Sequence, residues 1–402
     1  MKPIHLFAFV LAATFLQQDS VSAETGVTYV NCNLPPAHLM PGMPRDRLAR
    51  AIRNAQPGDT LVVNGTCEES ITIDKGPLTI DGKGTAAIAG TKFDPASAEF
   101  HGLVTIDGAQ GVTLRGLTIR DSLGEGILAV RGAGFILENV EVKDNHTGVR
   151  VSQSNLEFRN SEIRASHGTA LMAISGSTVV FRGHAELSGN AGAGLFLEGN
   201  SMGEIRGAQV HTDNNLLGVV ASQHSTIAVL ELESGVGSTL SARKNHAIGM
   251  QFGQGMLMVA GEGRPVGNVL IESSGNGGPG LVAVAGSQIA SPFGAGRFVF
   301  EENPVGMVLS SDASLEVRGG LQLINNFGPG LVASGAGVVT LRSWPDPDHP
   351  GPIADPSPSS IMGNGGPAVI ADFGTRLDLK DIAIGGPVFC DPTVLSRTDI
   401  CN

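Results

Sequence analysis

Apolar and small residues recur along the chain in one repeated unit. The unit starts with Asn, passes through a few small residues to Gly, and ends in a triplet of mostly apolar positions, as at 145–151, 190–197 and 326–333. Successive units are mostly about 22–24 residues apart, with some longer steps, which indicates one coil per unit and loops inserted at fixed corners. The small residues that precede the triplets are Gly102, Gly126, Gly148, Ala170, Gly194, Gly218, Gly249, Gly280, Gly306, Gly330 and Ala368.

Each unit also holds short runs of the strand type. Residues 134–142 and 155–163 are examples of such short β-type runs, and no helical period occurs inside the units. Leucine-rich repeats share the period, but they need a Leu-x-x-Leu-x-Leu frame, which these units lack. We therefore predict an all-β chain that forms a single-stranded, right-handed parallel β-helix of about ten or eleven coils.

The apolar triplets predict which side chains face the core. Because side chains alternate along a strand, the first and third positions should point inward, and both are apolar from the 126 unit to the 368 unit. The second position should point outward, yet it is apolar in most units, and this outward stripe includes Met172, Phe196, Val220, Val282 and Val308. Such a stripe indicates either cover by an insertion or the C-terminal tail, or a surface for a partner or for self-association.

The Asn of each unit is predicted to be structural. Asn tolerates the left-handed conformation of a turn, and stacked Asn amides can hydrogen-bond from coil to coil. Because the repeat returns an Asn to the same corner, we expect a ladder of amides there.

The segment before the repeats resembles a known family. Residues 47–67, with their helical stripe and Pro-Gly-Asp turn, are similar to the first segment of secreted pectin-lyase-like β-helix proteins, and residues 71–84 are similar to the first coil of that superfamily. Leu48 and Ile52 lie on the apolar stripe, so we expect a helix over residues 44–55 that caps the open end of the coils. The resemblance covers roughly residues 28–390 and implies the fold, because the superfamily includes lyases, hydrolases, epimerases and proteins with no known chemistry.

The catalytic motifs that the resemblance implies are missing from this chain. Pectate lyases would have clustered Asp ligands for calcium and an Arg base, and polygalacturonases would have Asn-Thr-Asp, Asp-Asp, Gly-His-Gly and Arg-Ile-Lys strings, none of which occurs here. Mannuronan epimerases share an Asp-Pro-His-Asp string, which the segment 346–349 only permutes inside a Pro-rich insertion at 342–361. A cleft for acidic glycans would also be lined by Lys, Arg and Asp, unlike the outward stripe.

Four residues near one corner carry candidate acid–base chemistry. His146 and His167 fall at the same corner of successive coils, and Asp144 and Arg150 are close to them in sequence. His titrates near neutral pH, so this group is suited to proton transfer. The alternative is a solvated turn.

The Pro-rich insertion carries a candidate binding site. Trp344 offers a platform for a sugar ring, and Asp346, Asp348 and His349 offer polar groups for a sugar or for calcium. The alternative is an ordinary rigid surface loop. No other cofactor or metal is predicted.

The net charge limits the classes of partner, and the cysteines predict disulfides. The formal net charge of −12 and the pI of about 5.3 disfavour nucleic acid and anionic membranes as partners. Cys32 and Cys67 lie near one end of the sequence, and Cys390 and Cys401 lie near the other. Three pairings are formally possible, and only the local one avoids joining opposite ends of a long solenoid, so we predict two terminal disulfides.

The first residues resemble a targeting sequence. Residues 1–23 combine Lys2, an apolar run and small residues at 21–23, as in a signal peptide. That run is too short to cross a bilayer, and no later run approaches the ~18 apolar residues of a transmembrane anchor. We expect the β-helix domain to span 24–402, with a disulfide-closed tail at 388–402, and to be secreted or periplasmic.

These observations favour a non-catalytic scaffold that binds a polysaccharide or a surface protein. The alternative is a polysaccharide lyase, glycoside hydrolase or epimerase with an unrecognised active site.

Overall fold

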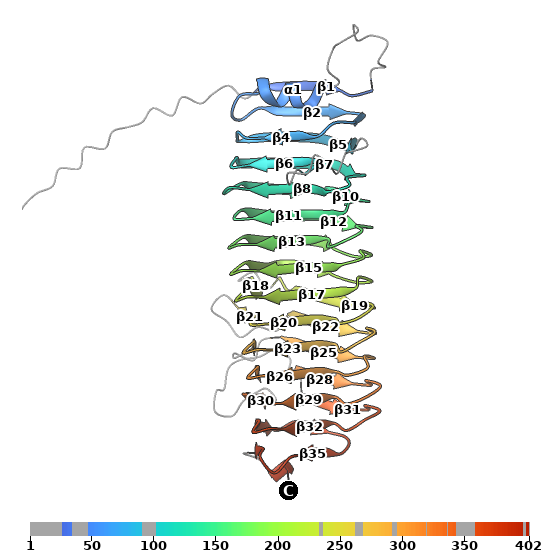
Figure 1. Cartoon of the computed structure of the whole chain (residues 1–402), viewed down its shortest axis with the longest axis vertical. Coiled ribbons are helices and arrows are strands. Elements are labelled where there is room, and N and C mark those ends of the chain that lie inside the picture. Colours follow the sequence, from blue (N-terminus) through green and yellow to red (C-terminus); the bar gives the residue numbers. More distant parts are fainter. Residues whose placement is uncertain are drawn as a thin grey trace, which may run out of the picture.

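The chain winds into a tall stack of coils. The computed structural model describes residues 26–33, 47–90, 102–232, 236–261, 268–291, 296–318, 320–335, 337–342, 358–396 and 399–401. Helix α1 (Arg47–Asn54) lies at one end of the stack and β35 (Val388–Cys390) lies near the other (Figure 1). Strands of successive coils pair in parallel and form two long sheets, which confirms the prediction of an all-β parallel β-helix.

The smaller sheet, here called sheet B, has 13 strands within the described chain. Each apolar triplet of the repeat forms one of them, and β4 and β35 extend the sheet beyond the units that the sequence revealed. Its strands are β4 (Ile71–Ile73), β6 (Val104–Asp107), β8 (Glu125–Val130), β11 (Thr147–Ser152), β13 (Leu171–Ile174), β15 (Ala193–Glu198), β17 (Leu217–Ser222), β20 (Met250–Gly253), β23 (Leu281–Val284), β26 (Met307–Ser310), β29 (Leu331–Ser334), β32 (Val369–Asp372) and β35.

The larger sheet, sheet A, has 23 strands within the described chain and bends around a corner. Asn160, Gly183 and Gly207 have φ angles of 45°, 70° and 57°, so the longer strands turn there and supply two faces of the coil. Its strands are β1 (Val27–Asn31), β2 (Thr60–Asn64), β3 (Thr66–Cys67), β5 (Leu78–Ala89), β7 (Gln110–Arg120), β9 (Gly134–Glu138), β10 (Glu141–Lys143), β12 (Asn155–Arg164), β14 (Thr178–Glu186), β16 (Met202–His211), β18 (Thr226–Glu231), β19 (Ser238–Arg243), β21 (Met256–Gly261), β22 (Val269–Ser274), β24 (Gln288–Ser291), β25 (Arg297–Glu301), β27 (Ser314–Arg318), β28 (Gly320–Ile324), β30 (Val338–Arg342), β31 (Ser360–Met362), β33 (Arg376–Lys380), β34 (Ala383–Ile384) and β36 (Leu395–Ser396).

The core runs the length of the stack. From β8 to β32, the first and third residues of every triplet are at most 1% exposed, as the alternation predicted. The parallel register places like positions of successive coils together, for example Leu171 beside Leu195. Each fully buried aliphatic side chain of this kind contributes about 1.5–3 kcal/mol, so the repeat itself builds the main source of stability.

A ladder of buried Asn amides follows one corner of the coils, as predicted. The backbone N–H of Asn245 donates to Oδ1 of Asn276 at 2.8 Å, and that of Asn276 donates to Oδ1 of Asn303 at 3.1 Å. Nδ2 of Asn276 also donates to the carbonyl oxygen of Ala242 at 3.1 Å. The amide ladder includes Asn145, Asn190, Asn215, Asn245, Asn276, Asn303, Asn326 and Asn364.

The left-handed residue of this corner is not the Asn. It is the residue before it, since Lys244, Gly275 and Glu302 have φ angles of 54°, 61° and 54°. The prediction that the Asn itself adopts this conformation is wrong at these coils. The preceding residue makes the turn, and the Asn that follows it is left with its side chain in the interior.

The amide ladder explains the Gly of the repeat. A Cβ on Gly218 would lie 2.8 Å from Nδ2 of Asn245, and a Cβ on Gly280 would lie 2.8 Å from Nδ2 of Asn303. Real Cβ atoms do not approach other heavy atoms so closely. At these coils the Gly therefore makes room for the Asn of the next coil, whereas Ala170 stands at the same position before Asn190.

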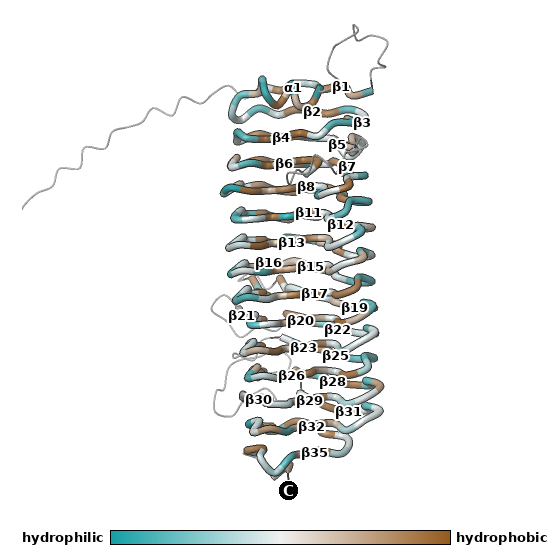
Figure 2. Tube along the Cα trace, viewed as in Figure 1, coloured by the Kyte–Doolittle hydropathy of each residue, from teal (hydrophilic) through white to brown (hydrophobic). Residues whose placement is uncertain are grey.

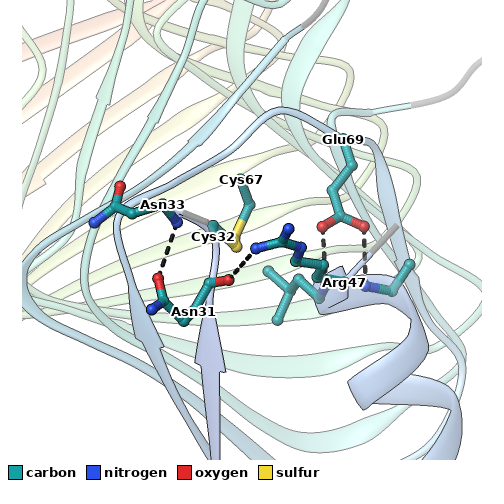
Figure 3. Close-up of a disulfide and its surroundings, with 8 residues drawn as sticks. Asn31, Cys32, Asn33, Arg47, Cys67 and Glu69 are labelled. Carbon is teal, nitrogen blue, oxygen red and sulfur yellow. Dashed lines mark hydrogen bonds between the residues drawn. A yellow bond between two sulfur atoms is a disulfide. The ribbon is translucent and has the colours of Figure 1, made fainter. Parts of the chain in front are cut away.

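Helix α1 closes one end of the stack. Leu48 and Ile52 are at most 1% exposed, and the carboxylate of Glu69 accepts hydrogen bonds from the backbone N–H of Leu48 at 2.8 Å and of Ala49 at 3.1 Å (Figure 3). A carboxylate at this end satisfies free N–H groups and the helix dipole. The helix was predicted over 44–55, of which 44–46 lie outside the described residues.

Both predicted disulfides are present. Cys32 pairs with Cys67 and Cys390 pairs with Cys401, with Cα–Cα distances of 5.1 and 5.5 Å. Residues 1–23 and most of the insertion at 342–361 lie outside the described residues. Among the residues that are described, no helix is long and apolar enough to cross a bilayer.

Candidate functional site

The outward positions of sheet B form one continuous column, here called the outward ladder. Met172 pairs in register with Phe196, and Phe196 pairs with Val220, so the outward stripe is aligned as predicted. Val220 is 7% exposed, whereas Met172 and Phe196 are half-buried. Beyond Gln251, which pairs with Val220 and Val282, the outward ladder continues with Val282 and Val308. Figure 2 shows hydrophobic segments along strands of this sheet such as β4, β6 and β13.

The outward ladder is interrupted near its start by Arg150. This residue pairs in register with Leu128 on one side and Met172 on the other. A cavity of about 450 Å³ opens at this place. We call it the Arg150 groove, and it is lined by Thr105, Asp107, Leu128, Val130, Arg131, Arg150, Ser152 and Gln153.

The charges of the Arg150 groove are paired. Nη1 of Arg150 lies 3.4 Å from Oε1 of Glu125, whose side chain is 13% exposed. Arg131 forms an ion pair with Asp107 from the neighbouring coil. The groove is therefore polar and nearly neutral, with guanidinium, hydroxyl and amide groups able to donate hydrogen bonds.

The structure places His146 and His167 at the same corner of successive coils, as predicted. The backbone N–H of His167 donates to the carbonyl oxygen of Asn145 at 2.9 Å, and both His side chains are exposed. Asp144 is also exposed, with a φ of 53°. Arg150 lies apart from them on the outer face of β11, where it pairs with a carboxylate.

The predicted binding residues of the Pro-rich insertion, Trp344, Asp346, Asp348 and His349, lie outside the described residues. Their proposed affinity for a sugar or calcium stays a prediction.

Ion pairs connect successive coils on the outer face of sheet A. Lys83 and Arg115 lie 2.8 and 2.7 Å from Oδ2 of Asp81, whose side chain is 3% exposed. Burial by itself raises the pKa of Asp81, but hydrogen bonds from Lys83 and Arg115 outweigh this effect and lower the pKa to about 2. Such a carboxylate stays ionised at neutral pH, so it serves to hold coils together and not to donate a proton.

A second polar group, which the sequence reading missed, lies on another part of sheet A. His184 and Glu186 share the outer face of β14, and Glu186 pairs in register with His211 of β16. The His184 and His211 ring centroids are 5.4 Å apart. A His-x-Glu string in one unit and a His at the matching place in the next was the available signal, and aligning the sheet-A strands would have revealed it.

One group of potential metal ligands in the described chain has three ligand atoms within 4.8 Å of one another, namely Cys32, Cys67 and Glu69. Its two sulfur atoms are joined in a disulfide, and its carboxylate caps α1. This group is therefore structural.

Comparison with known proteins identifies the fold. Residues 102–270 match a family model described as a right handed beta helix region. No protein in the search of curated sequences matches the chain.

Three solved structures are similar to the chain at low sequence identity. Pectate lyase Pel9A is 13% identical, with a TM-score of 0.41 over 74% of this chain and 79% of that one. The A-module of mannuronan C-5 epimerase AlgE6 from Azotobacter vinelandii is 15% identical, with a TM-score of 0.39 over 87% and 93%. A mannuronic acid specific polysaccharide family 6 lyase from human gut microbiota is 12% identical, with a TM-score of 0.35 over 90% and 82%.

These likenesses carry no information about the site. Parallel strand pairing continues before and after the segment 102–270 that matches the family model, so both observations indicate the same fold. The chain therefore folds as a right-handed parallel β-helix.

Proposed function

We propose that the chain is an exported, non-catalytic binding protein whose Arg150 groove holds a segment of a polysaccharide. The observation that carries this proposal is the groove itself. It opens on the long outer face of sheet B, where a chain-like ligand can extend along or across the strands.

The lining of the groove suits a sugar. A sugar ring has hydroxyl groups at its rim and apolar C–H groups on its faces. Arg150, Ser152 and Gln153 offer hydrogen bonds, and the half-buried Val130 offers apolar surface beside them. The volume of about 450 Å³ is within the ~300–1,000 Å³ usual for small-ligand sites.

The pairing of its charges favours binding over catalysis. A general base must have a lone pair free to reach the substrate proton. In the groove, the carboxylates of Asp107 and Glu125 already accept from Arg131 and Arg150. A general base in the groove would have to use an oxygen lone pair that these ion pairs leave free, because both carboxylates are paired.

Export is supported by the two disulfides. Both close local loops at the ends of the stack, and such bonds persist in oxidising compartments. The net charge of −12 fits a soluble partner better than nucleic acid.

The test is a panel of acidic and neutral polysaccharides, with binding measured by calorimetry and chemistry followed by the absorbance of unsaturated products and by reducing ends. We expect at least one polysaccharide to bind without product. Arg150→Gln should weaken binding about tenfold or more, because a hydrogen bond to a charged group contributes about 1.5–3 kcal/mol.

Arg206→Gln is the matched control. Arg206 also pairs with a strand carboxylate, Glu204, at 2.7 Å, but it lies on sheet A. Equal loss of binding in both variants would contradict the assignment of the groove. Product formation would favour the alternative, a polysaccharide lyase, hydrolase or epimerase, and absence of binding to the whole panel would refute the proposal.

A further inference from the structure

Another groove opens on the outer face of sheet A, near the end of the stack opposite α1 (Figure 1). It has a volume of about 330 Å³ and crosses β30, β33 and β36, which pair in register on successive coils. We call it the Arg376 groove, and its lining includes Val338, Thr340, Arg376, Asp378, Leu395 and Ser396. It is separate from the Arg150 groove, which lies on sheet B.

Arg376 lies between two apolar side chains. The strand register pairs it with Val338 on one side and with Leu395 on the other. Val338 is 42% exposed and Leu395 is 60% exposed, so both present apolar surface to solvent. Because neighbouring strands are about 4.8 Å apart, this surface flanks the side chain of Arg376. The groove therefore combines a cation with aliphatic walls.

The positive charge of Arg376 has no partner of its own. The residue is exposed, and its guanidinium forms no hydrogen bond or ion pair within the described chain. The carboxylate in the lining is held by another cation, since Oδ2 of Asp378 accepts from Nη2 of Arg342 at 2.9 Å. On the neighbouring strand β27, Oε1 of Glu316 lies 3.0 Å from Nη2 of Arg318 in a similar pair. Arg376 is therefore able to bind an anion from outside the chain.

The charges around the Arg376 groove favour an anion. Outward positions alternate along β27, β30 and β33, and they carry four cations and two carboxylates. These residues are Arg318, Arg342, Arg376, Lys380, Glu316 and Asp378. The chain as a whole has a net charge of −12, so this surplus of cations is local. A local positive potential attracts a negatively charged ligand to this face.

We propose that the Arg376 groove binds a small aliphatic carboxylic acid in its ionised form. The planar guanidinium of Arg376 pairs with both oxygens of the carboxylate through two N–H groups. Val338 and Leu395 cover the aliphatic chain, and the burial of this apolar surface adds affinity. The volume of about 330 Å³ lies within the ~300–1,000 Å³ usual for small-ligand sites. An uncharged alcohol lacks the first contact, and a sugar acid lacks the second.

The test is titration of the full chain with octanoate by isothermal calorimetry, below the concentration at which octanoate forms micelles. We expect one octanoate to bind per chain. Octanol lacks the charge and gluconate lacks the aliphatic chain, so each should bind roughly tenfold more weakly or worse. Arg376→Gln should weaken octanoate binding by about tenfold or more, because it removes a charge-assisted pair. Leu395→Ser should also weaken it, because part of the apolar wall is lost.

Arg297→Gln is the matched control, because Arg297 is likewise exposed at the first position of a sheet-A strand, β25. It should bind octanoate as the unaltered chain does. Far-ultraviolet circular dichroism checks that each variant is folded. The proposal is overturned if octanoate does not bind, if octanol binds as tightly, or if folded Arg376→Gln keeps its affinity. Polysaccharide binding at the Arg150 groove is measured separately, so failure of one proposal leaves the other standing.

Discussion

Replacing Asn276 by Ala tests whether the amide ladder holds the coils together. The side chain is 4% exposed. Its Oδ1 accepts from the backbone N–H and from Nδ2 of Asn245, at 2.8 and 3.0 Å. Its Nδ2 donates to the carbonyl oxygen of Ala242 at 3.1 Å and to Oδ1 of Asn303 at 2.9 Å. Asn276→Ala removes all of these bonds at once.

The magnitude follows from the groups left behind. The backbone N–H of Asn245 and the carbonyl of Ala242 lose this partner in a place that water does not reach. Each unsatisfied buried group costs about 1–3 kcal/mol, so the loss from the two groups is roughly 2–6 kcal/mol. Because each coil contacts only its neighbours, a defect in a central coil weakens the interfaces on both sides.

The measurement is urea unfolding followed by far-ultraviolet circular dichroism, in parallel with the melting temperature. Asn155→Ala is the matched control, because Asn155 is exposed at the start of β12 and its backbone N–H bonds to Ala133 in any case. We expect the control to unfold within about 0.5 kcal/mol of the unaltered chain. The reasoning is refuted if Asn276→Ala is as stable as Asn155→Ala.

Three further predictions concern other positions. Ser166 stands at the position of an Asn of the amide ladder, and its buried Oγ has no hydrogen-bond partner in the described chain. Ser166→Asn should therefore extend the amide ladder from Asn145 and raise the free energy of unfolding by about 1 kcal/mol. A lower melting temperature of this variant would contradict the prediction. Asp81 has a folded pKa of about 2, below its unfolded value of about 3.9, so its contribution of about 2 kcal/mol is present above pH 4 and is lost as the pH falls towards 2. The melting temperatures of the unaltered chain and Asp81→Asn should therefore differ at pH 7 and converge at pH 2, and a difference independent of pH would count against the ion pairs. Val220→Ser should lower stability by about 1–2 kcal/mol because Val220 is buried, whereas Phe196→Ser should mainly abolish any self-association seen in sedimentation; if both leave stability and association unchanged, the outward stripe has no role.

The sequence by itself determined the repeat, the inward register and the ends of the stack. Alternation along a short strand decides which side chains face inward, so the core positions, such as Leu171 and Leu195, could be predicted from spacing alone. The pairing of Cys32 with Cys67 followed from the length of the solenoid between the two cysteine pairs. These are local or one-dimensional properties, and a repeat protein is built almost entirely from them.

Tertiary structure alone decided which polar side chains meet. Gly275, and not Asn276, adopts the left-handed turn conformation, since the backbone must turn before the Asn side chain can point inward. The sequence predicted Arg150 near His146, but in the structure Arg150 pairs with the carboxylate of Glu125 on the neighbouring coil. His184 and His211 came together only through the register of two strands in different coils. Units differ in length and loops lie between them, so the register that joins such side chains is set by strand pairing in space and not by distance along the chain.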